Sequence, residues 1–207
     1  MLSQRNIGLQ EIVNLLAPDA CLCVPDAARA DDTLTDVVHD SRAVTPGALF
    51  VCIRGFEFDG HSFAARAVEQ GAAALLVEEI LPLDAPQVVV PDTKAALATV
   101  ASAFYGNPSR SVAVFGITGT NGKTTTTYIL DSILRQHGLK TGIVGTVEVR
   151  SGNRRLPAGR TTPESSELQR LLGDMADEGV GAVSMEVSSH AIDLHRVDAV
   201  QFAAVAF

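Results

Sequence analysis

The sequence predicts an α/β protein with two parts, a small N-terminal α/β domain followed by the first part of a domain with a mostly parallel sheet. Two observations support this. Short apolar runs alternate with polar turns and one helical segment between residues 37 and 90, and a strand, a glycine loop and a helix follow one another at residues 112–134. A length of 207 residues with 46% hydrophobic content is enough for two cores.

The N-terminal part is predicted to begin with a helix at residues 7–16, which Pro18 ends. A strand at residues 37–38 then leads into the polar turn Asp40-Ser41-Arg42, and a second buried strand follows at residues 48–53. Three hydrogen-bonding side chains at the end of a strand suit a polar ligand. An ordinary turn, in which Asp40 caps and Arg42 is solvated, explains them equally well.

A second polar turn, residues 54–61, precedes a helix that we expect to be capped by Ser62, to run through Gln70 and to end at Gly71. Strands are predicted at residues 73–77 and 87–90, so this part has the strand-helix-strand order of a partly parallel sheet. His61 in the turn is more typical of a structural histidine than of a ligand.

The boundary between the two domains is predicted at residues 91–93, where Pro91 ends a strand and Asp92 or Thr93 can cap a new helix. That helix spans residues 94–105, and we assign it to the second domain. The expected domains are therefore residues 1–91 and 92–207.

The glycine loop lies between an apolar strand at residues 112–115 and a helical pattern that continues to Gly138. Its sequence is Thr118-Gly-Thr-Asn-Gly-Lys-Thr124, although the strict pattern G-x-x-x-x-G-K-[ST] is absent. Backbone N–H groups and the helix N-terminus attract phosphate, Lys123 adds a full positive charge, and Thr124 can place a hydroxyl on Mg²⁺. The alternative is an ordinary loop rich in glycine and threonine.

Beyond this helix we expect a strand at residues 141–149, a hairpin-like turn at 151–153, and the segment Thr161-Thr162-Pro163-Glu164. With Thr161 or Thr162 as N-cap, this segment would open a helix with a long apolar face. The exposed N–H groups of such a helix can also take an anion.

A last apolar run, residues 182–187, delivers the carboxylate of Glu186 to the carboxyl edge of the sheet that also carries the glycine loop. A buried carboxylate needs a partner, and Mg²⁺ beside a phosphate is one candidate. A core glutamate held in a salt bridge is the alternative.

These motifs resemble, in order, the Mur ligase family, ATP-dependent enzymes that add amino acids to bacterial cell-wall precursors. The resemblance covers nearly everything from Asp40 to Phe207. The segments that carry it are D-S-R-x-V-x-P-G-x-L-F-V at residues 40–51, G-x-x-x-D-G-H-x-F at 55–63, T-G-T-N-G-K-T at 118–124, T-T-P-E at 161–164 and M-E-V-S-S-H-A at 185–191.

The resemblance implies a role for each matching position. The N-terminal domain would bind the uridine diphosphate of the precursor, and the second domain would bind ATP with Mg²⁺. Lys123 and Glu186 are implied as catalytic, and Thr124 and Glu186 as metal ligands. The implied nucleotide-binding residues are Gly119, Thr120, Asn121, Gly122, Lys123, Thr124 and Thr125, and the implied precursor-binding residues are Ser41, Phe58, Asp59, Thr161, Thr162, Ser188 and Arg196.

The implied activity is the ATP-dependent addition of a third amino acid, meso-diaminopimelate or L-lysine, to UDP-N-acetylmuramoyl-L-alanyl-D-glutamate through an acyl phosphate. The segment M-E-V-S-S-H-A favours the ligase of the third step. The alternatives are the ligase of the fourth step, another phosphate-loop enzyme such as a kinase, and a non-catalytic fragment that binds nucleotide or UDP-sugar.

Family members continue, after a segment like residues 202–207, into a carbamylated lysine that helps to hold a second Mg²⁺ and into a third domain for the incoming amino acid. We therefore expect this chain alone to be inactive and to expose an unpaired strand edge. Glu57 and Leu194 stand where many relatives carry amide side chains, so those two substrate contacts are not expected to be kept.

Composition limits the other possibilities. A net charge of −8 argues against a nucleic-acid partner, and the absence of a signal peptide or long apolar span leads us to expect a cytoplasmic protein without a membrane span. The three cysteines form neither a disulfide framework nor a zinc pattern. By the resemblance, the parent protein is expected to be monomeric.

Overall fold

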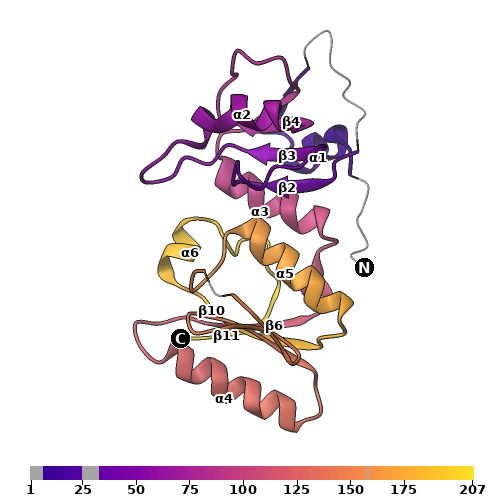
Figure 1. Cartoon of the computed structure of the whole chain (residues 1–207). Helices are drawn as coiled ribbons and strands as arrows, with labels where there is room; N and C mark the ends of the chain where they lie inside the picture. The colour runs from indigo at the N-terminus through magenta and orange to yellow at the C-terminus, as the bar shows by residue number, and fades with distance from the viewer. Residues whose placement is uncertain (1–6, 25–32, 158) are drawn as a thin grey trace. The chain divides into compact units, whose positions relative to one another are not determined.

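The computed structural model describes residues 7–24, 33–157 and 159–207. The chain divides into two compact units, and each is described by itself. The N-terminal unit is Gln4–Phe104, and the C-terminal unit contains Tyr105–Phe207 (Figure 1). Both are α/β units with mostly parallel sheets, as the sequence predicts.

The sheet of the N-terminal unit has five strands in the order β1-β5-β4-β3-β2. The four strands from β2 to β5 are parallel, and β1 pairs antiparallel with β5 at one edge. β3 and β4 are buried along their whole length, as expected for the middle of a sheet covered on both faces. The strands are β1 (Cys21–Cys23), β2 (Asp36–Val38), β3 (Ala48–Val51), β4 (Ala74–Val77) and β5 (Gln87–Val89).

Helices cover both faces of this sheet (Figure 1). On one face, Ala64 and Ala67 of α2 (Ala64–Glu69) belong to the same core cluster as Phe50 and Leu75. On the other face lies α3 (Thr93–Phe104), which packs against α1 (Leu9–Leu16) and β2.

The assignment of this third helix to the second domain was wrong, because α3 belongs to the N-terminal unit. Asp92 does cap it, since its carboxylate accepts hydrogen bonds from the N–H groups of Lys94 (2.8 Å) and Ala95 (3.1 Å). The units therefore meet in sequence at Phe104 and Tyr105, about one helix later than predicted.

The helix after β3 begins differently from the prediction. Asp59 is the cap, and it opens a short 3₁₀ segment, η1 (Gly60–Phe63), that continues into α2. Ser62 lies inside η1 and donates to the carbonyl oxygen of Asp59 at 2.6 Å. Gly71 follows the helix with φ +94°, a conformation that glycine adopts without strain, as predicted.

The sheet of the C-terminal unit has six strands in the order β11-β6-β10-β7-β8-β9. The strands β11, β6, β10 and β7 are parallel to one another, and β8 and β9 continue the sheet antiparallel. Their bounds are β6 (Ala113–Ile117), β7 (Thr141–Val144), β8 (Val149–Ser151), β9 (Arg154–Leu156), β10 (Ala182–Glu186) and β11 (Phe202–Ala206).

The single strand predicted at residues 141–149 is two strands. The chain turns after Val144, and the N–H of Gly145 donates to the carbonyl oxygen of Glu148 at 3.1 Å. β8 then returns antiparallel to β7, and the predicted turn around Gly152, where φ is +55°, joins β8 to β9.

Two long helices lie on opposite faces of the sheet (Figure 1). α5 (Ser165–Asp177) buries Leu168, Leu172 and Met175 in a core with β6 and β10. α4 (Lys123–Gln136) contacts β10, β7 and β6 on the other face. The shorter helical segments are η2 (Pro108–Arg110) and α6 (Ser189–Asp193).

The packing of α4 differs from its apolar pattern. Ile129 and Ile133 are 56% and 48% exposed, whereas Thr127 and Asp131 are buried. The buried polar groups have partners: Thr127 Oγ1 donates to the carbonyl of Lys123 at 2.8 Å, and Asp131 Oδ1 accepts from Thr141 Oγ1 at 2.6 Å. The Thr127 bond stays within the helix, and the Asp131 bond joins α4 to β7.

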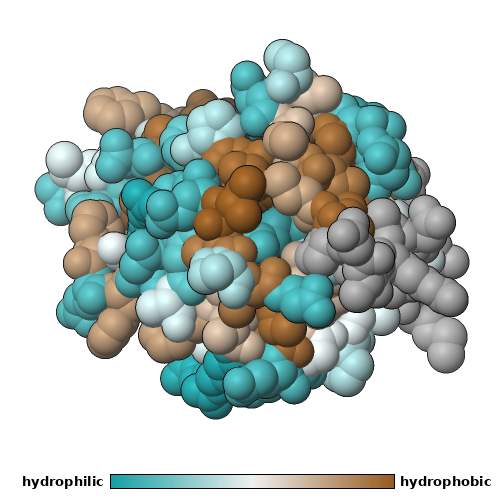
Figure 2. Space-filling model, turned by 90° about the horizontal axis from the view of Figure 1, so that it is seen from above, coloured by the Kyte–Doolittle hydropathy of each residue, from teal (hydrophilic) through white to brown (hydrophobic). Residues whose placement is uncertain are grey.

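In the part of the chain that the structure describes, no helix is both long enough and apolar enough to cross a bilayer. Hydrophobic side chains do gather on the face of the molecule that Figure 2 shows. Exposed apolar residues of the N-terminal unit include Phe56 (87%), Phe58 (67%) and Ile80 (65%).

Candidate functional site

A glycine loop joins β6 to α4, as the sequence predicts. Gly119 has φ +130°, and Gly122, with φ +79°, is the N-cap of α4. These backbone conformations are rare for residues with a side chain, so the two glycines allow the chain to curl before the helix begins. Thr120, Asn121, Gly122 and Thr125 are exposed, which leaves the loop and the first turn of α4 open to a ligand.

Lys123 folds back over this loop. Its Nζ donates to the carbonyl oxygen of Gly119 at 2.7 Å, and its side chain is half-buried. An ammonium has three N–H donors, so this contact holds the charge at the loop and leaves donors for an anion. Together with the N-terminal N–H groups of a 14-residue helix, it makes the loop a candidate phosphate-binding site.

Glu186 lies beside the loop because its strand pairs directly with the strand that leads into the loop. Glu186 is in register with Ile117 at the ends of β10 and β6, and it is 2% exposed. Its Oε2 accepts a hydrogen bond from Thr124 Oγ1 at 3.0 Å. Among the described residues, the ion pairs do not include Glu186, so the alternative of a salt-bridged core glutamate was wrong.

The turn after β7 supplies the other donors to Glu186, and sequence reasoning missed it. The N–H of Thr146 donates to Oε1 at 2.9 Å, and the Thr146 hydroxyl donates to Oε2 at 3.2 Å. A Cβ on Gly145 would lie 2.4 Å from Oε1, so any side chain there would force the carboxylate or the turn to shift. The available signal was a Gly-Thr pair directly after a buried strand in a parallel sheet.

The predicted segment Thr161-Thr162 reaches the same place. Thr162 is buried, and its hydroxyl donates to the carbonyl oxygen of Glu186 at 2.9 Å and accepts from the N–H of Ser188 at 3.2 Å. The Oγ1 atoms of Thr161 and Thr146 are 2.9 Å apart. The structure thus joins Thr161, Thr162 and Ser188 to the Glu186 side of the loop.

Neither threonine caps the next helix, which corrects that prediction. Glu164 is the N-cap of α5, and its N–H donates to the side chain of Glu167 at 3.3 Å in a capping box. The hydroxyl of Thr162 is occupied by the end of β10 instead.

Arg196 joins this cluster through Glu164. Its Nε donates to Glu164 Oε2 at 3.1 Å, and its Nη1 donates to the carbonyl of Thr162 at 3.4 Å. The side chains of Arg196 and Glu164 are 14% and 10% exposed. A second arginine, Arg160, contacts the same carboxylate oxygen at 3.4 Å from a more exposed position. The guanidinium of Arg196 therefore has a fixed place next to the threonines.

The oxygen atoms of Glu186 and Thr124 are suitable ligands for a magnesium ion. A carboxylate and a hydroxyl in contact, next to a phosphate-binding loop, are the hard oxygen ligands that Mg²⁺ takes together with phosphate oxygens. In the part of the chain that is described, no group of three His, Cys, Asp or Glu residues could hold a metal by protein ligands alone. Thr124 and Glu186 thus suit a metal that arrives with phosphates.

In the N-terminal unit, the turn after β2 is internally bonded. Asp40 accepts from the backbone N–H of Arg42 at 2.9 Å and pairs with its guanidinium at 2.7 Å. The Arg42 hydrogen bonds lower the pKa of Asp40 to about 2. The ordinary turn, in which Asp40 caps and Arg42 is solvated, is therefore present. It places the buried Ser41 at the carboxyl end of the sheet.

The turn after β3 is fixed by a histidine. Asp59 Oδ1 accepts from the N–H of His61 at 2.9 Å and lies 2.6 Å from its Nδ1, while His61 Nε2 accepts from the N–H of Glu78 at 3.0 Å. Partial burial acts to raise the pKa of Asp59, but the hydrogen bonds from His61 hold it below its ordinary value. His61 is thus structural, as predicted, and Asp59 anchors the turn that carries the exposed Phe58.

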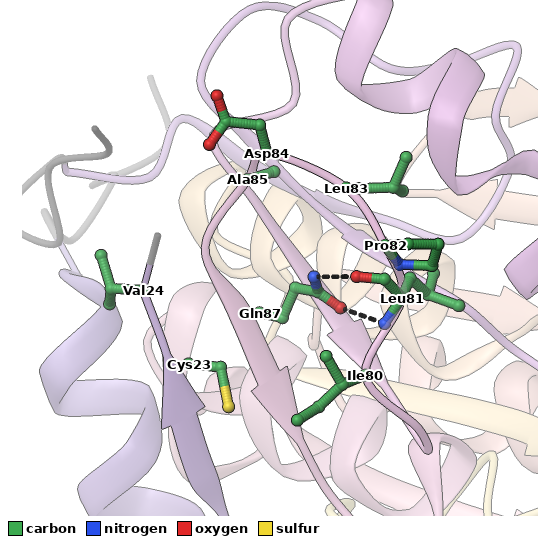
Figure 3. Close-up of a pocket in the computed structure, with 9 residues that line it drawn as sticks. All are labelled: Cys23, Val24, Ile80, Leu81, Pro82, Leu83, Asp84, Ala85 and Gln87. Carbon is green, nitrogen blue, oxygen red and sulfur yellow. Dashed lines mark hydrogen bonds between the residues drawn. The ribbon is translucent and has the colours of Figure 1, made fainter. Parts of the chain in front are cut away.

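A cavity of about 490 Å³ lies at another edge of this unit (Figure 3). It is lined by the end of β1, by residues 80–85 and by Gln87, whose amide group bonds both the N–H and the carbonyl of Leu81 at 2.8 Å. None of the predicted site residues lines it. Its mostly apolar wall offers no phosphate-binding group.

The sites of the two units are built on the same principle. Ser41, Phe58 and Asp59 follow β2 and β3, which are neighbouring parallel strands of the N-terminal unit. In the C-terminal unit, Lys123 and Thr146 follow β6 and β7, and Glu186 is the last residue of β10. Parallel sheets bind ligands at the carboxyl ends of their strands. The fold and the loop define an α/β protein with a candidate phosphate-binding site.

Comparison with known proteins places this α/β protein in a family. Residues 33–105 match the model described as Mur ligase family, catalytic domain, and residues 117–207 match the Mur ligase middle domain. The chain belongs to the Mur ligase family.

Several relatives share one name, UDP-N-acetylmuramoyl-L-alanyl-D-glutamate–2,6-diaminopimelate ligase. The protein from Geobacillus thermodenitrificans (strain NG80-2) is 54% identical over 158 residues, which are 76% of this chain and 32% of the relative. The protein from Chlorobaculum tepidum is 48% identical over 185 residues, 88% of this chain and 36% of the relative. The chain thus spans about a third of the length of these relatives.

Solved structures show the same fold. A structure of a ligase with that name has a TM-score of 0.77 at 23% identity, over 97% of this chain and 40% of the other. The MurF ligase from Thermotoga maritima, solved in complex with ADP, has a TM-score of 0.56 at 26% identity, over 81% of this chain and 35% of the other.

Proposed function

We propose that this chain is the precursor- and nucleotide-binding part of an ATP-dependent ligase. The ligase would join diaminopimelate to UDP-N-acetylmuramoyl-L-alanyl-D-glutamate, the substrates in the names of its relatives. One observation carries the proposal: Thr124 of the phosphate loop bonds to the Glu186 carboxylate, and Thr162 of the T-T-P-E segment bonds to the backbone carbonyl of the same residue. Thr161 is linked to Glu186 through Thr146. A nucleotide phosphate at the loop and a substrate group at the threonines would then lie side by side.

In the proposed site, the loop residues Gly119 to Thr125 hold the phosphates of ATP. Lys123 neutralises phosphate charge, and its contact with Gly119 keeps the ammonium at the loop before the nucleotide arrives. Thr124 and Glu186 would hold Mg²⁺, which when bound neutralises charge on the phosphates. Thr146 and Gly145 keep the Glu186 carboxylate in place.

The proposed precursor-binding residues are found in each of the two units. In the N-terminal unit, Ser41 can donate to and accept from the nucleotide part, and the exposed Phe58 offers an aromatic face, with Asp59 fixing its turn. In the C-terminal unit, Thr161, Thr162, Ser188 and Arg196 would hold the part that reacts. Arg196 is the positive group of this set, which suits a precursor that carries carboxylates.

The proposed chemistry has two transfers. A carboxylate oxygen of the precursor attacks the γ-phosphorus of ATP, the bond from that phosphorus to ADP breaks, and an acyl phosphate forms. The amine of diaminopimelate then attacks the acyl carbon, phosphate leaves, and the nitrogen loses a proton to give the amide. Protein side chains position the reactants and neutralise charge in both transfers, and they form no covalent bond.

Because the proposed substrates are ATP and a UDP-linked precursor, we expect the protein to be in the cytoplasm.

Calorimetric titration of the chain with ADP, with and without Mg²⁺, tests the nucleotide part of the proposal. The parent chain is expected to bind ADP more tightly with Mg²⁺, and Glu186→Gln is expected to lose this gain because a neutral amide is a poor Mg²⁺ ligand. Glu69→Gln, at an exposed position of α2, is the matched control. Equal Mg²⁺ dependence in the parent and Glu186→Gln would contradict the proposal.

A further inference from the structure

Three side chains form a hydrogen-bonded row between the loop side of Glu186 and the T-T-P-E segment. The Thr161 and Thr146 Oγ1 atoms are 2.9 Å apart, and Thr146 Oγ1 is 3.2 Å from Glu186 Oε2. Thr146 is exposed and Thr161 is half-buried, so both can meet a ligand. Thr146 is the only member of this row that bonds to both of the others.

The direction of the row follows from counting hydrogens. A threonine hydroxyl has one hydrogen to donate, and an ionised carboxylate can only accept. The Thr146 hydroxyl therefore donates its hydrogen to Glu186, and the Thr161 hydroxyl must donate to Thr146. In this state the hydrogen of Thr161 is committed to Thr146.

The same oxygen of Glu186 also accepts from Thr124. Under the proposed function, Oε2 would be the oxygen that holds the cation, because it is the one in contact with Thr124, whereas Oε1 accepts from the N–H of Thr146. An oxygen that ligates a cation is a weaker hydrogen-bond acceptor, because its lone pairs are drawn toward the charge. The hydrogen bond from the Thr146 hydroxyl to Glu186 is then weaker, and this hydroxyl can donate to Thr161 instead.

We propose that Thr146 couples the two ligands of this site, a divalent cation with nucleotide on the Glu186 side and an anionic substrate group on the Thr161 side. The inference rests on the proposed function. When Glu186 engages the cation, the Thr146 hydroxyl turns toward Thr161, and the hydrogen of Thr161 becomes available to a carboxylate or phosphate oxygen. Thr146 is thus a positioning residue. Its backbone N–H holds the Glu186 carboxylate, and the direction of its hydroxyl links cation binding at Glu186 to the hydrogen of Thr161.

Two substitutions separate the hydroxyl from the rest of the residue. Thr146→Val keeps the shape and the N–H anchor on Oε1 but removes the hydroxyl, and Thr146→Ser keeps the hydroxyl. Thr99→Val, at an exposed position of α3, is the control for replacing a threonine by valine. Thermal unfolding of each variant shows whether it is folded before binding is measured.

The measurement is the NMR methyl signal of Thr161 in the threonine-labelled chain during titration with Mg²⁺·ADP. We expect this signal to shift in the parent, Thr146→Ser and Thr99→Val, and to move by less than about a third as much in Thr146→Val, although Mg²⁺·ADP still binds. An equal shift in Thr146→Val, or no shift in a parent that binds Mg²⁺·ADP, would overturn the inference and leave the proposed function standing. A parent that binds no nucleotide would overturn both.

A second readout is the affinity of the chain for UDP-N-acetylmuramoyl-L-alanyl-D-glutamate with and without Mg²⁺·ADP. By reciprocity, coupling through Thr146 makes precursor binding at least about fivefold tighter when Mg²⁺·ADP is present. Thr146→Val is expected to reduce this factor to about one, and Thr146→Ser to keep it. Thr161→Val provides the check on the pathway: once Thr161 lacks its hydroxyl, adding Thr146→Val should change the factor no further.

Discussion

The hydroxyl of Thr124 donates a 3.0 Å hydrogen bond to the carboxylate of Glu186, which lies 62 positions later in the sequence. The contact exists because β6 and β10 are adjacent parallel strands that end in register, at Ile117 and Glu186. It joins the phosphate-binding loop to the strand that carries the buried carboxylate. A substitution at either residue should therefore change the position of the other side chain.

Replacing Lys123 by alanine should weaken nucleotide binding and leave the fold intact. The ammonium bonds to the carbonyl of Gly119 at the loop and contributes no apolar packing. Loss of a charged hydrogen bond to phosphate is expected to raise the dissociation constant for Mg²⁺·ADP by about 10- to 100-fold. Calorimetry measures this, with Lys94→Ala on α3 as the control. Equal affinity in Lys123→Ala and the parent would remove Lys123 from the site.

Replacing Gly145 by alanine should disturb Glu186 sterically. The new methyl group would lie 2.4 Å from Glu186 Oε1 and 3.3 Å from its Cγ, so the carboxylate or the turn must move. We expect the free energy of unfolding to fall by about 1–3 kcal/mol and the Mg²⁺ dependence of ADP binding to decrease. Gly159→Ala is the matched control, because a Cβ there meets nothing within 4 Å. Urea unfolding that does not distinguish the two variants would contradict this account.

Replacing Arg196 by lysine should weaken precursor binding selectively. The guanidinium bonds to Glu164 through Nε and to the Thr162 carbonyl through Nη1, and lysine lacks this planar pair of nitrogens. We expect about a tenfold loss of affinity for the precursor and little change for Mg²⁺·ADP. Arg160→Lys removes the other, more exposed arginine from the same carboxylate and is the control. If both variants lose precursor affinity equally, Arg196 has no special role.

The Asp40–Arg42 pair should make a small, pH-dependent contribution to stability. The pKa of Asp40 in the folded protein, about 2, is below its ordinary value of 3.8, so the pairing stabilises the fold above pH 3.8 and is lost as the pH falls toward 2. Both side chains are well exposed, at 37% and 81%, which keeps the effect small. Melting temperatures of Asp40→Asn and the parent should differ slightly at pH 6 and converge only as the pH approaches 2. Asp84→Asn, at an exposed position, is the control.

Uridine diphosphate should bind to the two turns at the carboxyl ends of β2 and β3. In an NMR titration of the chain with UDP, we expect saturable shifts at residues 40–42 and 55–61. Ser41→Ala should weaken binding by about 2- to 10-fold, the worth of one hydrogen bond, whereas Glu57→Gln should not, because a negative charge opposes a diphosphate. Saturable shifts elsewhere, with these turns unaffected, would leave the proposed UDP site without support.

Much of the C-terminal site could be predicted from local sequence. The strand, loop and helix around Lys123 lie in one continuous stretch, and glycines at positive φ mark the turn. Glu186 could be placed because a carboxylate at the end of an apolar strand must come to the edge where the neighbouring loop lies. These inferences needed only periodicity and the geometry of parallel sheets.

Other features depend on contacts that local patterns do not contain. The Gly145-Thr146 turn was hidden inside an apolar run, and its importance comes from Glu186, which is 40 positions away from Thr146. The side on which α3 packs is not encoded in its own apolar face, which is why it was assigned to the wrong unit. The true cap of α5 was missed because Thr162 looks like a cap but bonds to β10.

The sheet order of the C-terminal unit also determines when the phosphate loop can be completed during synthesis. β6 pairs on both sides with strands that come much later in the chain, β10 and β11. At roughly 5–20 residues per second, a ribosome delivers β6 and α4 several seconds before either partner strand. In that interval both edges of β6 lack their sheet neighbours, while the N-terminal unit is already complete in sequence. The loop would therefore mature after the N-terminal unit, and in that interval the nascent chain would be vulnerable to mispairing at the strand on which nucleotide binding depends.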